Sequence, residues 1–183
     1  MRYRFYKRVV LIIALVLCTF SCSSDLDFEQ AKDFNIQPAF TTNFAYLNVN
    51  APEFIIDGME QRLYSYVTNV DFLNTSFVEE DLVKAELYFR IKNTIARSYV
   101  YNVTFLDQNN TAIYAITMNV PAYSGKEVLV EKTVTFTAAN VDVIKRTTKM
   151  IFSIGMYPGP PLTANSPGRV ELSSSITAYF DIK

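Results

Sequence analysis

The fold of this chain is decided by residues 84–107, which read KAELYFRIKNTIARSYVYNVTFLD. Every second residue from Leu87 to Ile91 is apolar, and Val103 and Phe105 repeat the pattern further on. A strand places alternate side chains on opposite faces, whereas a helix repeats every 3.6 residues. The stretch therefore predicts two β-strands with a polar break between them.

The same alternation returns along most of the remaining chain. It occupies residues 40–46, 113–119, 128–136, 150–156 and 170–182, with a break expected at 173–175 in the last segment. Residues 107–110 (DQNN) are typical of a hairpin turn. A short helix is expected at 138–145 and a helical turn at 79–81. About seven strands at roughly ten-residue spacing indicate an all-β fold, an antiparallel β-sandwich of immunoglobulin-like type with one or two short helices.

The composition agrees with strands and excludes several kinds of chemistry. The 183 residues include 14 Phe and 12 Tyr but no Trp and no His, and half of them are apolar. That length suits one domain with a real core. Without histidine, neither a Ser-His-Asp site nor an imidazole zinc site can form. No paired carboxylates stand out, so we expect a protein that is not an enzyme and that holds no metal and no cofactor.

The first 21 residues have the layout of a signal peptide. Residues 1–8 carry four basic side chains, residues 9–17 (VVLIIALVL) are all apolar, and a small residue, Ser21, follows. Nine apolar residues fall short of the roughly 20 that span a bilayer, and a transmembrane anchor is the alternative. Removal of residues 1–21 leaves 13 of the 17 basic residues and all 18 acidic ones, a net charge of −5. That charge gives no reason to expect nucleic acid as a partner.

Residues 19–22 (TFSC) resemble the bacterial lipobox. In lipoproteins of this kind a small residue precedes a cysteine that is diacylated and becomes the first residue of the mature chain. Ser21 and Cys22 fit, whereas Thr19 and Phe20 depart from the usual Leu and small residue. The resemblance implies lipidation at Cys22, and two acyl chains anchor a protein stably. The alternative is an ordinary signal peptide with an incidental cysteine.

The resemblance also implies how the chain is divided. Residues 22–33 form a lipidated N-terminus and tether, and residues 34–183 form the β-sandwich domain. Residues 22–29 (CSSDLDFE) look like the start of lipoproteins of the Bacteroidota, which implies a lipid-anchored protein of the outer membrane, on its periplasmic or its surface face. The whole length resembles flavobacterial lipoproteins for which no activity is known. Residues 84–107 are similar to small β-sandwiches of the late-embryogenesis-abundant type, which are binding or structural modules.

The loop at residues 157–168 (YPGPPLTANSPG) is the first candidate for a site. It holds four prolines and two glycines, so it is stiff and cannot form a strand. Loops on a rigid sandwich commonly carry binding residues. We expect a ligand or partner to contact Tyr157, Pro158, Pro160, Pro161 and Asn165. The alternative is a plain connection between two strands.

Pairs of tyrosines form the second candidate. Tyr99 and Tyr101 lie two residues apart and share one face of a strand, as do Tyr64 and Tyr66. Such an aromatic face can stack against a sugar ring. The alternative is that these tyrosines line a partly exposed sheet and bind nothing.

Two functions of different classes fit these features. The first is a non-catalytic envelope module that is anchored to the membrane through its N-terminal lipid and binds another envelope protein or stabilises an assembly. The second is a surface lipoprotein that captures a glycan or small molecule for a transporter. A tyrosine-lined cleft beside the proline-rich loop would favour capture. An apolar edge strand or flat patch would favour a protein partner.

Overall fold

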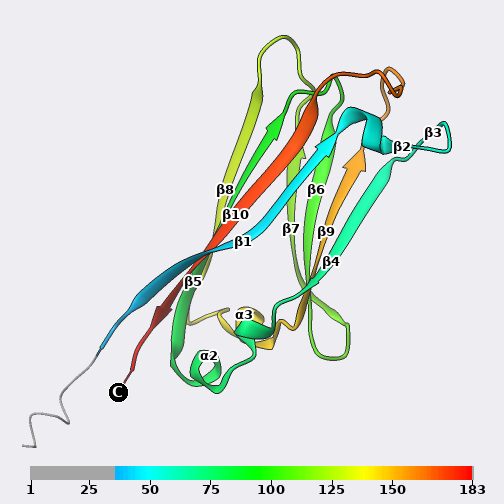
Figure 1. The fold of residues 1–183 in the computed structure, drawn as a ribbon. Coiled ribbons are helices and arrows are strands. Elements are labelled where there is room, and N and C mark those ends of the chain that lie inside the picture. The colour runs from blue at the N-terminus through cyan, green and yellow to red at the C-terminus, as the bar shows by residue number, and fades with distance from the viewer. Residues whose placement is uncertain (1–35, 183) are drawn as a thin grey trace, which may run out of the picture. The chain divides into compact units, whose positions relative to one another are not determined.

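Two four-stranded antiparallel sheets face each other in the computed structural model, which describes residues 36–182 (Figure 1). Their strands are β1 (Ala39–Asn50), β4 (Leu63–Asn69), β5 (Leu82–Asn93), β6 (Tyr99–Leu106), β7 (Ala112–Val120), β8 (Val128–Phe136), β9 (Lys149–Met156) and β10 (Arg169–Phe180). The order is β1-β10-β5-β8 in one sheet and β4-β9-β6-β7 in the other. The antiparallel β-sandwich that the alternation predicts is confirmed.

Smaller elements join these strands. A hairpin of β2 (Ile55–Ile56) and β3 (Met59–Glu60) brings the described strands to ten rather than about seven. The α-helices of the described region are α2 (Ser76–Asp81) and α3 (Asp142–Arg146), near the two expected positions, and η2 (Ala51–Phe54) and η3 (Asp71–Leu73) are 3-10 turns. The signal peptide, the lipidation at Cys22 and the tether lie outside the described residues.

The strand pairing has a simple rule. Strand β1 pairs with β10, β4 with β9, β5 with β8, and β6 with β7, all antiparallel. The eight long strands thus pair as one long hairpin would, from its open end to its turn. This hairpin is folded over, so that β10 also pairs with β5 and β9 also pairs with β6. Eight strands in this order make a jelly roll. An immunoglobulin domain distributes its strands differently, as four against three in the constant type.

The core lies between the sheets and explains the alternation. In β5, Ala85, Leu87, Phe89 and Ile91 are buried at alternate positions, and the central strands β6, β9 and β10 bury alternate residues over most of their length. Burial of one such aliphatic or aromatic side chain contributes about 1.5–3 kcal/mol. Central strands therefore carry a strong period of two in their sequence.

The expected break at residues 173–175 does not occur, because β10 runs through it. Ser174 is buried, and its hydroxyl accepts a hydrogen bond from the Ala45 amide at 2.9 Å and donates one to the Ala45 carbonyl at 3.2 Å. Ala45 follows a β-bulge in β1, where the register shifts between Asn43 and Ala45. A serine side chain thus replaces a main-chain partner at an irregular point of the ladder.

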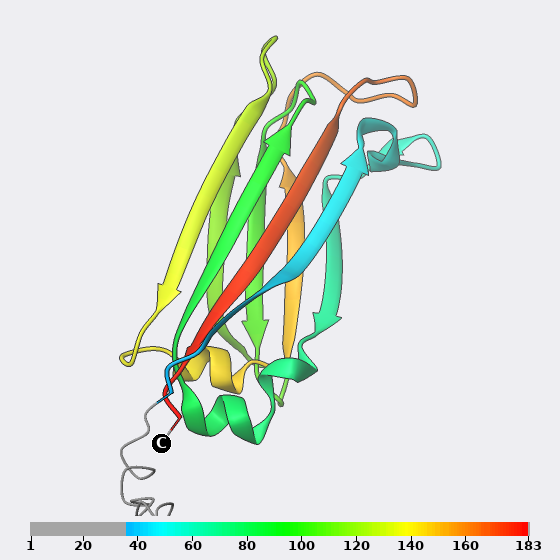
Figure 2. The ribbon, with the colours of Figure 1, turned by 60° about the vertical axis from the view of Figure 1, so that its left-hand side comes forward.

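The sandwich has two open sides, because each sheet has two edge strands. Strands β1 and β4 lie along one side, and β8 and β7 along the other (Figure 2). The proline-rich loop lies at the end of the sandwich away from α2 and α3 (Figure 1). Among residues 36–182 no helix combines the length and the hydropathy needed to cross a membrane.

Candidate functional site

The proline-rich loop connects β9 to β10, and one buried arginine of the β5–β6 connection holds it through hydrogen bonds. Arg97 is 2% exposed, and its Nη1 lies 2.9 Å from Glu60 Oε1. Its guanidinium also donates hydrogen bonds to the main-chain carbonyls of three loop residues, Tyr157, Gly159 and Pro160. A planar guanidinium with five donors can satisfy that many oxygens at once. We call these contacts of Arg97, with Glu60 and with the loop carbonyls, the clamp. The loop is thus held rigid by the clamp as well as by its prolines.

The clamp has two further parts. Glu60 Oε1 accepts a hydrogen bond from the Leu162 amide at 3.0 Å, so the carboxylate joins the β2–β3 hairpin to the loop. Gly159 lies so close to Arg97 that a Cβ there would stand 3.0 Å from its side chain. No sequence pattern points to Arg97 and Glu60, since they are 37 positions apart and neither belongs to a local motif.

A hollow of about 530 Å³ opens beside this loop. It is lined by Pro160, Pro161, Leu162 and Pro167 of the loop, by Tyr123, and by residues 94–96 of the β5–β6 connection. No charged side chain lines it. Two of the expected contact residues, Pro160 and Pro161, therefore border a hollow, whereas Tyr157, Pro158 and Asn165 lie in the loop outside its lining.

The expected aromatic face at Tyr99 and Tyr101 is corrected by the structure. The two rings share a face, but it is the inner face of β6, and both residues are completely buried. Strand β6 is central in its sheet, so the opposite sheet covers that face. Neither hydroxyl has a hydrogen-bond partner within the described residues, and burial raises the pKa of both phenols. These tyrosines are part of the core and cannot stack on a sugar.

Exposed aromatic residues lie instead along the side formed by β1 and β4, which we call the aromatic side. Tyr46 is 67% exposed, Tyr66 54% and Tyr64 38%. A groove of about 380 Å³ runs between the two strands and is lined by Phe44, Ala45, Tyr46, Leu47, Tyr64, Tyr66, Thr68, Phe152 and Leu172. Of this set, the sequence singled out the shared face of Tyr64 and Tyr66.

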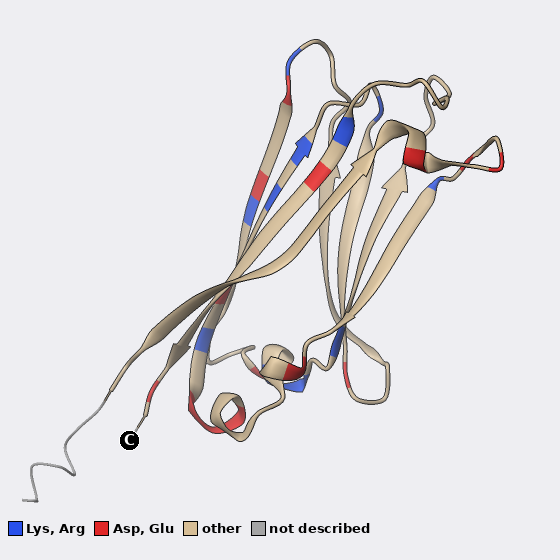
Figure 3. Cartoon of the chain, viewed as in Figure 1, with Lys and Arg blue, Asp and Glu red and all other residues tan. Residues whose placement is uncertain are grey.

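The bulge in β1 shapes the groove. It leaves Phe44 without a register partner, and the Phe44 ring lies 6.1 Å from that of Phe152 and 6.3 Å from that of Phe72. Residues 39–50 and 63–69 contain no Asp, Glu, Lys or Arg, and Figure 3 shows β1 without charge along its whole length. The aromatic side therefore offers aromatic and hydroxyl groups but no charge.

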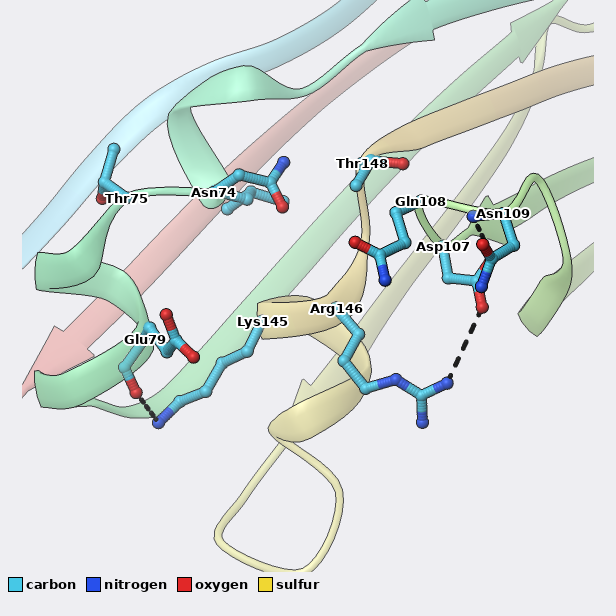
Figure 4. A pocket seen from close by; sticks show the side chains of 10 residues that line it. Asn74, Thr75, Glu79, Asp107, Gln108, Asn109, Lys145, Arg146 and Thr148 are labelled. Atoms are coloured by element: carbon cyan, nitrogen blue, oxygen red, sulfur yellow. Dashed lines mark hydrogen bonds and ion pairs between the residues drawn. The ribbon is translucent and has the colours of Figure 1, made fainter.

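A polar pocket of about 390 Å³ lies at the helical end of the sandwich (Figure 4). Its two cations point in opposite directions. Lys145 Nζ donates to the main-chain carbonyl of Glu79 at 2.8 Å, and Arg146 Nη2 lies 3.9 Å from Asp107 Oδ2. Asp107 Oδ1 in turn accepts from the amides of Asn109 and Thr111. Because each cation already has a partner on its own side, the pair does not converge on an anion.

An apolar cleft of about 210 Å³ opens at the same end. Phe40, Phe72 and Phe77 stand at its exposed rim, and the Phe77 ring stacks on Phe180 at 4.4 Å. No cluster of three or more Asp, Glu, His or Cys suited to a metal ion occurs in the stretch 36–182.

No protein-family model matches the sequence, and no curated protein does. Among solved structures, the chain is similar to a putative secreted protein from Parabacteroides distasonis (13% identity, TM-score 0.41, 63% of this chain and 38% of that one). It is also similar to VP2 of infectious bursal disease virus (10%, 0.44, 78% and 32%) and to tailspike protein 4 of bacteriophage CBA120 (13%, 0.34, 80% and 19%). The chain spans less than two fifths of each of these proteins.

Proposed function

We propose that this protein is a lipid-anchored envelope protein, a non-catalytic module that binds another envelope protein through its aromatic side. The observation that carries the proposal is a set of three exposed tyrosines, Tyr46, Tyr64 and Tyr66, on two edge strands without charge. The cores of protein interfaces are rich in Tyr and Phe and poor in charge. Exposed aromatic residues that gather around a groove, as these do, commonly mark a binding site.

The anchor follows from the N-terminal sequence. Lipidation at Cys22 would leave residues 23–35 between the lipid and the sandwich, a length of at most about 45 Å when extended. The module could then reach proteins at or near the surface of its membrane. Replacement of Cys22 by Ser is expected to move the protein from the membrane fraction to the soluble fraction, and continued membrane attachment of that variant would refute the anchor.

The binding surface is tested with one substitution and one matched control. Tyr66→Lys puts a charge in the middle of the aromatic side, whereas Leu129→Lys puts one on β8, where the leucine is 46% exposed. We expect an envelope protein that co-purifies from detergent-solubilised membranes to bind Tyr66→Lys at least about tenfold less tightly than the unchanged protein. Leu129→Lys should bind normally, and both variants should keep the parent's melting temperature. Equal binding by Tyr66→Lys would overturn the proposal.

The second candidate function is capture of a glycan or small molecule for a transporter. The uncharged hollow beside the proline-rich loop favours it, because Tyr123 borders the hollow and the clamped loop loses little entropy on binding. Replacement of Tyr123 by Ala should then weaken binding of the small molecule, whereas Tyr66→Lys should not. Deletion of the loop is a poor test, since it would leave Arg97 buried without its carbonyl partners.

A further inference from the structure

Strand β4 has a free main-chain edge whose groups can be assigned. The Arg62 carbonyl accepts a hydrogen bond from the Met156 amide at 2.8 Å, and the Val70 amide donates to the Thr148 carbonyl at 3.0 Å. These bonds fix the even-numbered residues as the ones that face β9. In an antiparallel ladder the residues between them point their N–H and C=O groups the other way. The main chain of Leu63, Ser65 and Val67 therefore faces away from the sheet.

These three residues have no main-chain hydrogen bond within the described part of the chain. Each carries one donor and one acceptor at the spacing that a further strand would need. Their register with β9 is continuous from Leu63 to Asn69, without a bulge. An edge of this kind is a template for strand pairing.

Strand β1, on the same side, is a poorer template. Its ladder is interrupted by the bulge between Asn43 and Ala45. At its end the Asn50 amide donates to the Glu53 side chain at 3.2 Å, so that donor is already used. Of the two free edges on the aromatic side, β4 is therefore the regular one.

The groove lies where the side chains of an added strand would go. Tyr64 and Tyr66 are opposite the buried residues Ile154 and Phe152 of β9, so they point toward the inside of the sandwich and line the groove. A strand beside β4 continues the pleat, and its alternate side chains would enter the groove next to these tyrosines. Since β4 carries no charge and the groove is lined by aromatic, apolar and hydroxyl side chains, an uncharged strand fits.

We infer that the free edge of β4 accepts an extended, uncharged segment of a partner protein as an additional strand, with apolar side chains at every second position seated in the groove. This inference rests on the proposed protein-binding function and adds how the partner is held. Main-chain hydrogen bonds supply affinity in this mode, and pockets for alternate side chains supply specificity.

A displayed library of random nine-residue peptides is the probe, selected on residues 22–183 carrying Cys22→Ser. We expect the selected peptides to be uncharged, with apolar residues alternating. Ser65→Pro removes one outward amide without touching the ladder to β9, and proline is tolerated on such an edge. It should weaken peptide binding about tenfold. Ser65→Ala, which keeps the amide, should bind within about twofold of the parent.

Hydrogen exchange gives a second readout that is independent of the proline. On peptide binding, the amides of Leu63, Ser65 and Val67 should gain protection, while those of Tyr64 and Tyr66 are already protected in the free protein. If Ser65→Pro fails to fold, Val67→Lys serves as the second variant with the same expected loss. Any of three results would overturn the inference: the peptides bind Ser65→Pro and Ser65→Ala equally well, peptide binding protects amides elsewhere in the chain instead, or no peptide is selected.

Two other occupants of the edge would also overturn it. Dimers that disappear in Ser65→Pro would assign the edge to a second copy of this chain. Edge amides that lose protection when residues 23–35 are deleted would assign it to the chain's own N-terminal segment. The two proposals fail separately. If Tyr66→Lys abolishes binding of the envelope protein but Ser65→Pro does not, only the added strand is refuted. If Tyr66→Lys binds normally, the proposed function is refuted.

Discussion

The two open sides of the sandwich differ in the residues that their edge strands point inward. On β8, Lys132 is opposite the buried Phe89 of β5, and on β4, Tyr66 is opposite the buried Phe152 of β9. Both positions point inward from an edge strand. Lys132 donates a hydrogen bond to the Thr117 carbonyl of β7 at 3.1 Å and so links the two edges, whereas Tyr66 borders an open groove.

The difference shows which edge is protected against pairing. An inward-pointing lysine on an edge strand is a common device against unwanted strand addition, because a new strand would bury its charge. Glu131, the neighbour of Lys132, lies 3.8 Å from Arg90 and adds charge to the outer face of the same sheet. The β1–β4 side has no such residue on its strands, which is expected of an edge kept free for a partner.

The largest expected effect is a loss of stability when the clamp is broken, and it should disturb the β4 side but not the β7–β8 side. Arg97→Ala removes the partner of Glu60 and frees the hairpin that leads into β4. We expect a loss of about 3 kcal/mol in the free energy of unfolding, the low end for a broken buried pair because Glu60 keeps some contact with water. Urea unfolding measures this loss. Hydrogen exchange should rise in residues 55–67 and remain unchanged in β7 and β8 under native conditions.

Arg169→Ala is the control for the clamp. Arg169 is paired with Glu171 at 3.5 Å, but it is well exposed, and exposed pairs contribute at most about 1 kcal/mol. A loss for Arg97→Ala no larger than that of Arg169→Ala would mean that the buried pair does not hold the β4 side in place.

The second prediction exchanges the character of the two sides. Lys132→Tyr makes the β8 edge resemble β4 and should raise self-association or peptide binding about tenfold, as judged by light scattering or peptide titration. Stability should change by about 1 kcal/mol or less. The control is Thr133→Tyr, which places the same ring on the outer face of the same strand. Association that rises equally in both variants would show that aromatic area, and not the inward lysine, sets the difference.

The smallest expected effect is the pH dependence of thermal stability that arises from Glu86 on β5. A hydrogen bond from Lys84 and a second from Tyr179 lower the pKa of Glu86 from its usual value. Because its pKa is lower in the folded protein, ionised Glu86 stabilises the fold at any pH above the ordinary carboxyl pKa. This contribution is lost as the pH falls below about 4. Thermal melting should therefore show a small acid-induced loss in the parent that is absent in Glu86→Gln. Tyr66→Phe, on the uncharged side, should retain the parent's pH dependence.

The sequence reveals the central strands better than the edges. Strands β5 and β9 are covered on one face along their whole length, so burial selects an apolar residue at every second position. Strand β4 is absent from the strands that the alternation predicts, and only the shared face of Tyr64 and Tyr66 points to it. Six of its seven residues are exposed, so burial leaves little alternation there. Of the two edge strands that line the groove, β4 is the more exposed and has the weaker signal in the sequence.

Other features depend on contacts that a local pattern does not contain. The spacing of Tyr99 and Tyr101 correctly puts them on one face, but only the opposite sheet determines that this face is buried. The clamp joins Arg97 to a carboxylate and to a loop about 60 positions away. Jelly-roll and immunoglobulin sandwiches share the same alternation, and the order of strands depends on long-range pairing.

The rolled hairpin also has a consequence for folding kinetics. Leu106 pairs with Ala112 across a turn closed by the Asp107 side chain, so β6 and β7 can meet within microseconds. Asn50 pairs with Arg169, and that ladder requires closure of a loop that contains most of the domain. We therefore expect a slow folder, on the millisecond-to-second scale, in which the ladder of β1 forms last. While the domain folds, the uncharged strand β1 would then stay unpaired longest, so its main-chain groups would be open to pairing with another chain for longer than those of any central strand.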